Sequence, residues 1–209
     1  VYPADRNLMK NIGKSLYTHF IKSMTVRRTI AVILGNMVLG MGAAGLRFSL
    51  LGNEPYTAMN MAISDGIQMS LGNYQLLLNL GLFILQLIWG RAYIGFGSII
   101  NLCFLGYIVE ASGYVLNLLL NSAEGYTLVQ KVLFMILSLV VLTFGISMYQ
   151  TANLGVAPYD YLALGITDHF PTPYFLNRVI TDAFSVLTIV LVVVGGLITW
   201  KESHLGIGT

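Results

Sequence analysis

Five long apolar runs, separated by short polar or glycine-rich stretches, divide the chain. Each run is close to the roughly 20 apolar residues that a membrane-spanning helix needs. The runs cover residues 29–50, 74–90, 98–120, 128–150 and 174–200. The pattern predicts an all-α fold, a polytopic membrane helix bundle with five full spans visible.

Two shorter segments between these runs are nearly alike. "LGNEPYTAMNMAISDG" covers residues 51–66 and "LGVAPYDYLALGITDH" covers residues 154–169, each just after a long apolar run. A shift of 103 positions brings glycine, proline, tyrosine and aspartate into one register. The aligned pairs are Gly42/Gly145, Leu51/Leu154, Gly52/Gly155, Pro55/Pro158, Tyr56/Tyr159, Ile63/Ile166, Ser64/Thr167, Asp65/Asp168 and Asn79/Asp182. We infer an internal duplication.

The duplication divides the membrane part into a first repeat, residues 29–122, and a second repeat, residues 126–209. "GFGS" (95–98) opens the third span and, with a gap of eight, aligns with "GIGT" (206–209). We therefore expect a sixth span after Thr209, which would leave the second repeat incomplete here. Because three spans per repeat is an odd number, the two repeats should have inverted topology, the plan of many secondary transporters.

The interruptions themselves predict short re-entrant half-helices. Gly52 and Gly155 permit backbone that a helix excludes, and Pro55 and Pro158 suit the first turn of a helix. The ten residues from Pro55 to Asp65 would span about 15 Å of helix, half a bilayer. The N-terminus of such a half-helix favours an anionic group or a polarised oxygen. The alternative is an extramembrane loop with a surface helix.

A substrate site near the membrane midplane, at the interface of the repeats, would follow from this plan. Candidate substrate-binding residues are Pro55, Tyr56, Ser64, Asn79, Glu110, Pro158, Tyr159, Asp160, Thr167, Arg178 and Asp182. The two tyrosines would line the cavity or belong to an interfacial aromatic belt.

The charged candidates each have two interpretations. Glu110, near the middle of the third span, would couple protons or be a neutral acid hydrogen-bonded between helices. Arg178 and Asp182 share one helix face, as a shielded ion pair or as partners in the substrate path. Asn79, at the repeat position of Asp182, would flank the site or join helices by a hydrogen bond. Asp160 would complement the helix dipole or contact a cation.

Composition agrees with a membrane protein, since charged residues are 10% of the chain against roughly 25% in soluble domains. Six of the eleven basic residues precede Ile30, which predicts a cytoplasmic N-terminus. Residues 1–28 would form a basic amphipathic segment on anionic lipid, or a flexible basic tail. A single cysteine, Cys103, excludes an internal disulfide and a cysteine-based zinc site.

No enzyme pattern is evident: the three histidines lack metal-ligand spacing, and there is no phosphate loop or nucleophile elbow. We expect no catalytic residue, metal, cofactor or nucleic-acid partner. The leading hypothesis is a small inner-membrane secondary transporter or permease of a small solute or ion. The alternatives are a non-transporting accessory or regulatory subunit that binds a protein or lipid, and a lipid scramblase or flippase. A homo-oligomer and a membrane-protein partner both stay open.

Three segments resemble a known family. They are "GLRFSLLGNEPYTAMNMAISDG" (45–66), "GISMYQTANLGVAPYDYLALGITD" (145–168) and the closing "GIGT". Together they resemble the YczE/YitT-like bacterial integral membrane proteins. The resemblance implies a small multi-span inner-membrane protein with glycine- and proline-marked repeats, and it implies location and architecture rather than a reaction. The first repeat departs from the second at Thr57, where the second has Asp160.

Overall fold

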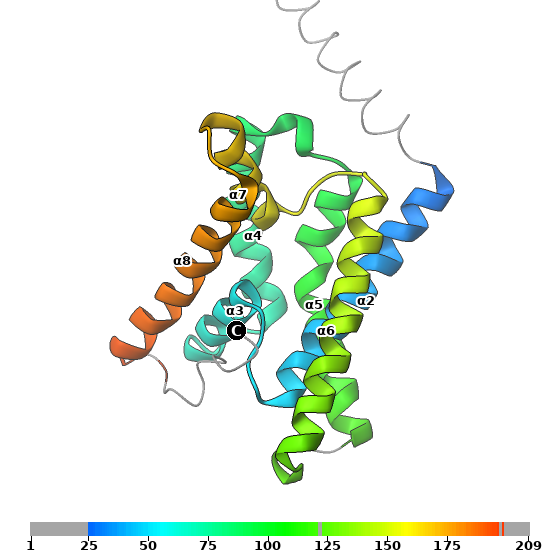
Figure 1. Cartoon of the computed structure of the whole chain (residues 1–209), viewed down its shortest axis with the longest axis vertical. Coiled ribbons are helices and arrows are strands. Elements are labelled where there is room, and N and C mark those ends of the chain that lie inside the picture. Colours follow the sequence, from blue (N-terminus) through cyan, green and yellow to red (C-terminus); the bar gives the residue numbers. More distant parts are fainter. Residues whose placement is uncertain (1–24, 121–122, 197, 199–209) are drawn as a thin grey trace, which may run out of the picture.

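The computed structural model describes residues 25–120, 123–196 and 198, and the elements in this part of the chain are helices (Figure 1). Five are long and apolar enough to cross a membrane: α2 (Val26–Ser49), α4 (Leu71–Trp89), α5 (Phe96–Leu120), α6 (Leu128–Thr151) and α8 (Tyr174–Val194). The predicted all-α bundle with five spans is confirmed. Most of the predicted N-terminal segment, and the predicted sixth span, lie outside the described residues.

Two twelve-residue helices and two short 3₁₀ turns lie between the spans. The helices are α3 (Pro55–Gly66) and α7 (Pro158–His169), and the turns are η1 (Arg91–Tyr93) and η2 (Ala123–Gly125). Proline opens both short helices, as predicted, because its missing N–H is not needed in the first turn. Eight of the twelve residues of α3 are buried in the bundle, namely Tyr56 to Ala62 and Ser64. α3 is therefore not a surface helix.

The ends of two spans differ from the prediction for local reasons. The second span begins at Leu71, earlier than residue 74, because the Ser70 hydroxyl caps the helix by accepting a hydrogen bond from the N–H of Asn73 at 3.4 Å. The fifth span ends at Val194 rather than at residue 200. Gly196 follows with φ 75°, and glycine in this left-handed region is a common helix stop.

The helices form two groups that meet at the centre of the molecule. α2 packs against both α5 and α6, and α4 joins α5 to the second group, in which α3 packs on α8 and α7 packs on α4 and α8. Figure 1 shows α3 and α7 toward opposite ends of the bundle. The two short helices therefore approach the centre from different sides.

α2 and α6 contact each other at two equivalent places: a glycine of α2 meets a leucine of α6, and a glycine of α6 meets a leucine of α2. A Cβ at Gly42 would lie 2.5 Å from the backbone N of Leu142, and a Cβ at Gly145 would clash with the backbone of Leu39. The shift of 103 positions maps Gly42 onto Gly145 and Leu39 onto Leu142. A two-fold arrangement would produce reciprocal contacts of this kind. Glycine allows the close helix approach at both places.

The second helix group is apolar outside and polar inside. Large apolar side chains such as Ile84 and Phe184 are exposed, at 51% and 68%, where lipid would cover them. The buried faces of α4 and α8 are instead mostly polar. The buried polar residues are Gln75, Asn79 and Gln86 on α4, and Asn177, Thr181 and Ser185 on α8. Such inward polar faces are a feature that periodicity alone did not reveal.

Candidate functional site

The backbone turns in the same way before each short helix. Leu50 and Asn153, which correspond by the 103-residue shift, are both left-handed, with φ 58° and 50°. Gly52 and Gly155 follow with φ 111° and 110°, a conformation that side-chain-bearing residues rarely adopt. The matching "LG" of the two segments therefore encodes matching turns that bring the chain to the start of each short helix.

The two short helices begin with different caps. The carboxylate of Glu54 accepts hydrogen bonds from the N–H groups of Tyr56 at 3.0 Å and Thr57 at 2.9 Å, and one from the Thr57 hydroxyl. α7 begins after Ala157, whose methyl group cannot accept a hydrogen bond, and Asp160 lies in its first turn. Each helix thus has one carboxylate at its N-cap or in its first turn, where the helix dipole favours negative charge.

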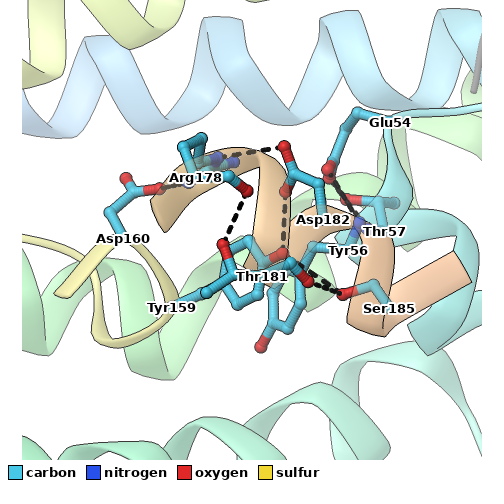
Figure 2. A network of polar contacts seen from close by, with 9 residues as sticks. All are labelled: Glu54, Tyr56, Thr57, Tyr159, Asp160, Arg178, Thr181, Asp182 and Ser185. Atoms are coloured by element: carbon cyan, nitrogen blue, oxygen red, sulfur yellow. Dashed lines mark hydrogen bonds and ion pairs between the residues drawn. The ribbon is translucent and has the colours of Figure 1, made fainter. Parts of the chain in front are cut away.

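Tyr56 and Tyr159 stack on each other at the centre of the site. Their ring centroids are 3.9 Å apart and their planes differ by 14°. The Tyr56 hydroxyl donates to Asn79 Oδ1 at 2.5 Å. The Tyr159 hydroxyl donates to Asp182 Oδ1 at 2.8 Å (Figure 2). Since Asn79 and Asp182 also correspond by the shift, the tyrosine of each short helix bonds to the same position of the long helix that follows it.

Arg178 connects the start of α7 to α8. Its Nη1 lies 2.5 Å from Asp160 Oδ1, its Nε lies 3.3 Å from Asp182 Oδ2, and its Cζ is 4.9 Å from the Tyr159 ring centroid. The predicted pairing of Arg178 with Asp182 is present, and Asp160 joins it from another helix (Figure 2). The guanidinium is therefore surrounded by two carboxylates and an aromatic face, which suits a planar nitrogenous cation.

A cavity of about 130 Å³ lies between the starts of α3 and α7. Its lining residues are Leu39, Glu54, Tyr56, Thr57, Asn101, Leu105, Val109, Leu142, Ile146, Ala157, Tyr159, Asp160 and Arg178. Drug-sized ligands occupy pockets of about 300–1,000 Å³, so this cavity suits an ion, a few water molecules or a very small solute. A cavity with polar and apolar walls thus lies at the starts of the two short helices.

Some candidate residues lie elsewhere. Glu110 is exposed and accepts a hydrogen bond from the N–H of Gly72 at 3.2 Å, at the start of α4. Ser64 and Thr167 bond to backbone carbonyls of their own helices, three and four residues earlier. Of the candidate residues, the structure therefore brings together those at the starts of α3 and α7 and on the buried faces of α4 and α8.

Residues that sequence reasoning did not single out complete the site. Glu54 could have been found from its position directly before Pro55, because the residue before an N1 proline is the N-cap. Ser185, whose hydroxyl is 3.2 Å from that of Tyr159, lies on the helix face of Asp182. Asn101, which donates to Asn36 at 3.0 Å, carries no comparable signal in the sequence.

A second, larger hollow of about 420 Å³ lies between α4 and α7. Its lining is mostly apolar and consists of Leu85, Trp89, Tyr161, Leu162, Gly165, Ile166, His169 and Phe170. We call it the lateral groove. Among the described residues, no group of three or more histidine, cysteine, aspartate or glutamate side chains could hold a metal ion.

The chain belongs to a protein family of unknown function, DUF6198, whose profile matches residues 26–209. It is 24% identical over 146 residues to an uncharacterized protein of Haemophilus influenzae, covering 68% of this chain and 63% of the relative. It is 22% identical over 149 residues to the uncharacterized membrane protein YczE of Bacillus subtilis, covering 71% of this chain and 66% of that relative. Each match spans less than two thirds of the relative's length, and no solved structure matches. These matches confirm the predicted YczE-like bacterial membrane family.

Proposed function

We propose that this chain is the core of a small secondary transporter of the bacterial cytoplasmic (inner) membrane, with its N-terminus in the cytoplasm and its substrate site between two inverted repeats. One observation carries the proposal. The half-helices α3 and α7 begin beside one central cavity, where Tyr56 and Tyr159 stack. Half-helix starts that meet near the midplane are the arrangement in which transporters bind substrates and ions.

Helix packing supports the inverted arrangement. Under the 103-residue shift, α2 corresponds to α6, α3 to α7 and α4 to α8. The contact of α3 with α8 then corresponds to that of α7 with α4, and both pairs pack in the structure. The reciprocal glycine contacts of α2 and α6 follow the same exchange. Three spans separate α3 from α7, so the two half-helices would enter from opposite membrane faces.

The polar faces of α4 and α8 support a path for a polar solute. Lipid offers no hydrogen bonds, so polar side chains within a membrane are expensive unless they meet protein, water or ligand. The extended segment before α3 is shielded in this way, since Asn53 Nδ2 donates to the carbonyl of Ala43 at 3.0 Å. The inward polar residues of α4 and α8 would line the route that leads to the cavity.

Transport would follow from rocking one repeat against the other. The stacked tyrosines belong to different repeats, so any separation of the repeats at the centre must part or slide the two rings. Arg178, by contrast, forms its ion pairs among the described residues with Asp160 and Asp182, which both belong to the second repeat. The second repeat would therefore move as a unit that is held together by its own ion pairs.

A second candidate function, a non-transporting subunit that binds lipid, is favoured by the lateral groove. Its mostly apolar lining and its volume of about 420 Å³ would suit part of an acyl chain. The same lining argues against the scramblase alternative, because a lipid headgroup needs a polar surface along its route. The reactivity of cavity residues from the two membrane faces distinguishes transport from this second function.

The test uses single cysteines in a Cys103→Ser background, in membrane vesicles of both orientations. Thr57→Cys and Ala157→Cys place a thiol in the cavity wall, and Ala43→Cys, in the packed core, is the control. We expect a membrane-impermeant methanethiosulfonate reagent to modify a cavity thiol from either face, while the control stays unreactive. Modification from one face only, or from neither, would contradict alternating access.

A flux measurement completes the test. Proteoliposomes on a solid-supported membrane are challenged with gradients of protons, alkali ions, ammonium and small organic ions and solutes, and charge movement is recorded. We expect at least one gradient to produce a current that is lost in Asp182→Asn. If every current is the same in this variant as in the unaltered chain, the proposed site is wrong.

A further inference from the structure

Arg178 occupies a position whose counterpart in the first repeat carries no charge. In the second repeat the guanidinium lies beside the Tyr159 ring, between Asp160 and Asp182. We call this arrangement the cation position. Applying the 103-residue shift replaces Tyr159 by Tyr56 and Arg178 by Gln75. The first repeat therefore has the aromatic ring of a cation position without its cation.

The first repeat also has a carboxylate near this position, but a different residue, Glu54, supplies it. Thr57 corresponds to Asp160, and its hydroxyl donates to the carboxylate of Glu54. The acid thus lies directly beside the residue that replaces the aspartate. Asn79 corresponds to Asp182, and its Oδ1 is the acceptor for Tyr56. The surroundings of a cation, an acid, an aromatic ring and an oxygen acceptor, are all present.

Gln75, which replaces Arg178, is a buried residue with unpaired polar atoms. Its side chain is 1% exposed, and in the described part of the chain neither its Nε2 nor its Oε1 has a hydrogen-bond partner. The Nδ2 of Asn79, one helical turn away, is also unpartnered among these residues. Leaving buried polar atoms unpaired costs roughly 1–3 kcal/mol each. Gln75 does not itself line the cavity; it lies against Gly106, which follows the cavity-wall residue Leu105 in α5.

The charges of the site also favour a cation. The site holds three carboxyl groups, those of Glu54, Asp160 and Asp182, and one guanidinium; with all three acids ionised, the formal excess is two negative charges. The two half-helix starts together contribute about one positive charge. An anion would have to displace both carboxylates from Arg178, whereas a cation would meet the excess acid. The volume of about 130 Å³ limits that cation to a small one.

We propose that the first-repeat counterpart, formed by Glu54, Tyr56, Thr57, Gln75 and Asn79, binds a small nitrogenous cation, a primary ammonium or a guanidinium group. This inference rests on the proposed function, for which it names the substrate class. The ligand takes the place that Arg178 fills in the second repeat. Its N–H groups donate to the Glu54 carboxylate and to the Gln75 amide oxygen, and its charge lies against the Tyr56 ring.

The test is equilibrium binding to the purified chain in mild detergent. Isothermal titration is carried out with methylammonium chloride and guanidinium chloride at constant ionic strength, and with sodium, potassium and acetate salts for comparison. We expect saturable binding of one of the two nitrogenous cations, at least about tenfold tighter than that of Na⁺ or K⁺. Equal binding of the alkali ions, binding of acetate alone, or no saturable binding would overturn the proposal.

Two variants locate the ligand. Glu54→Gln keeps an oxygen that can cap α3 but removes the charge, and should weaken binding roughly ten- to a hundredfold, as expected for one charged hydrogen bond. Asp65→Asn, at the other end of the same helix and paired with Arg47 on the surface, is the matched control and should bind as the unaltered chain does. Equal affinities in Glu54→Gln and in this control would overturn the assignment.

Gln75→Arg supplies the missing cation from the chain itself. It should abolish binding, whereas Gln75→Met, of similar size and without charge, should bind several-fold more weakly but measurably. Full binding by Gln75→Arg would contradict the proposal. The outcomes also separate the two proposals, because binding is measured without transport. Cavity thiols reactive from both faces without cation binding would end this inference and leave the transporter proposal intact, and the reverse result would end the transporter proposal alone.

Discussion

The crossing of α2 and α6 gives a prediction whose size can be worked from the structure. A methyl group at Gly42 would lie 2.5 Å from Leu142 N and 2.6 Å from Leu142 Cα, and one at Gly145 would meet the backbone of Leu39. Ordinary contacts of this type need at least about 3.5 Å. Because backbone atoms cannot rotate away, the two helices must move apart by roughly 1 Å.

Replacing either glycine by alanine should therefore destabilise the fold. Overpacking typically costs about 1–3 kcal/mol, and the better helix propensity of alanine returns about 0.8–1.0 kcal/mol. Because both clashes are with backbone atoms, the overpacking cost should lie in the upper part of that range, about 2–3 kcal/mol. We therefore expect Gly42→Ala and Gly145→Ala each to lower the free energy of unfolding by about 1–2 kcal/mol. Since one separation of the helices relieves both clashes, the double variant should lose less than the sum, by about 0.5 kcal/mol or more.

The assay is equilibrium unfolding in mixed micelles, with SDS as the denaturant. Gly81→Ala and Gly113→Ala are the matched controls, because a Cβ at either place meets nothing within 4 Å, and these variants should be neutral or slightly stabilising. If the variants at the crossing behave like the controls, α2 and α6 do not approach as described. If their costs simply add, the two contacts are not one shared crossing.

Two further predictions concern the polar network. Arg178→Met leaves two carboxylates without their cation and should lower the free energy of unfolding by about 2–4 kcal/mol. The triple variant that also carries Asp160→Asn and Asp182→Asn should recover most of this loss. Equal losses in the two variants would contradict a mutually dependent cluster. Tyr159→Phe removes a hydrogen bond to a carboxylate and should cost about 1.5–3 kcal/mol, while Tyr56→Phe removes one to an amide and should cost about 1 kcal/mol. Both are measured by the same unfolding assay, and a larger loss in Tyr56→Phe would refute the assignment of acceptors.

Much of the fold could be predicted because the bilayer sets a length for apolar runs. The five spans follow from this length rule. Pro55 and Pro158, which the sequence placed in the first turn of a helix, are the first residues of α3 and α7. Local chemistry also predicted the pairing of Arg178 with Asp182, because residues four apart share a helix face. The errors lie at helix ends, where a cap at Ser70 and a left-handed Gly196 decide the boundary.

The candidate site was less predictable, because it depends on contacts between residues far apart in the sequence. Tyr56 meets Tyr159, and Asp160 meets Arg178, only through the packing of four helices. No local pattern distinguishes an inward tyrosine from one in an interfacial belt. Glu110 is the opposite case, because its charge near the middle of a span suggested a site. Its carboxylate instead accepts a hydrogen bond from the N–H of Gly72, at the start of the neighbouring helix α4.

The side of the membrane on which the two half-helices end tests the central claim most directly. Gln68 follows α3 and Pro171 follows α7, and both are exposed. With Gln68→Cys and Pro171→Cys placed one at a time in a Cys103→Ser background, a membrane-impermeant maleimide is applied to intact cells and to inverted vesicles. Inverted repeats predict labelling of the two positions from opposite faces, Gln68→Cys from outside and Pro171→Cys from inside. Labelling of both from the same face would contradict the account.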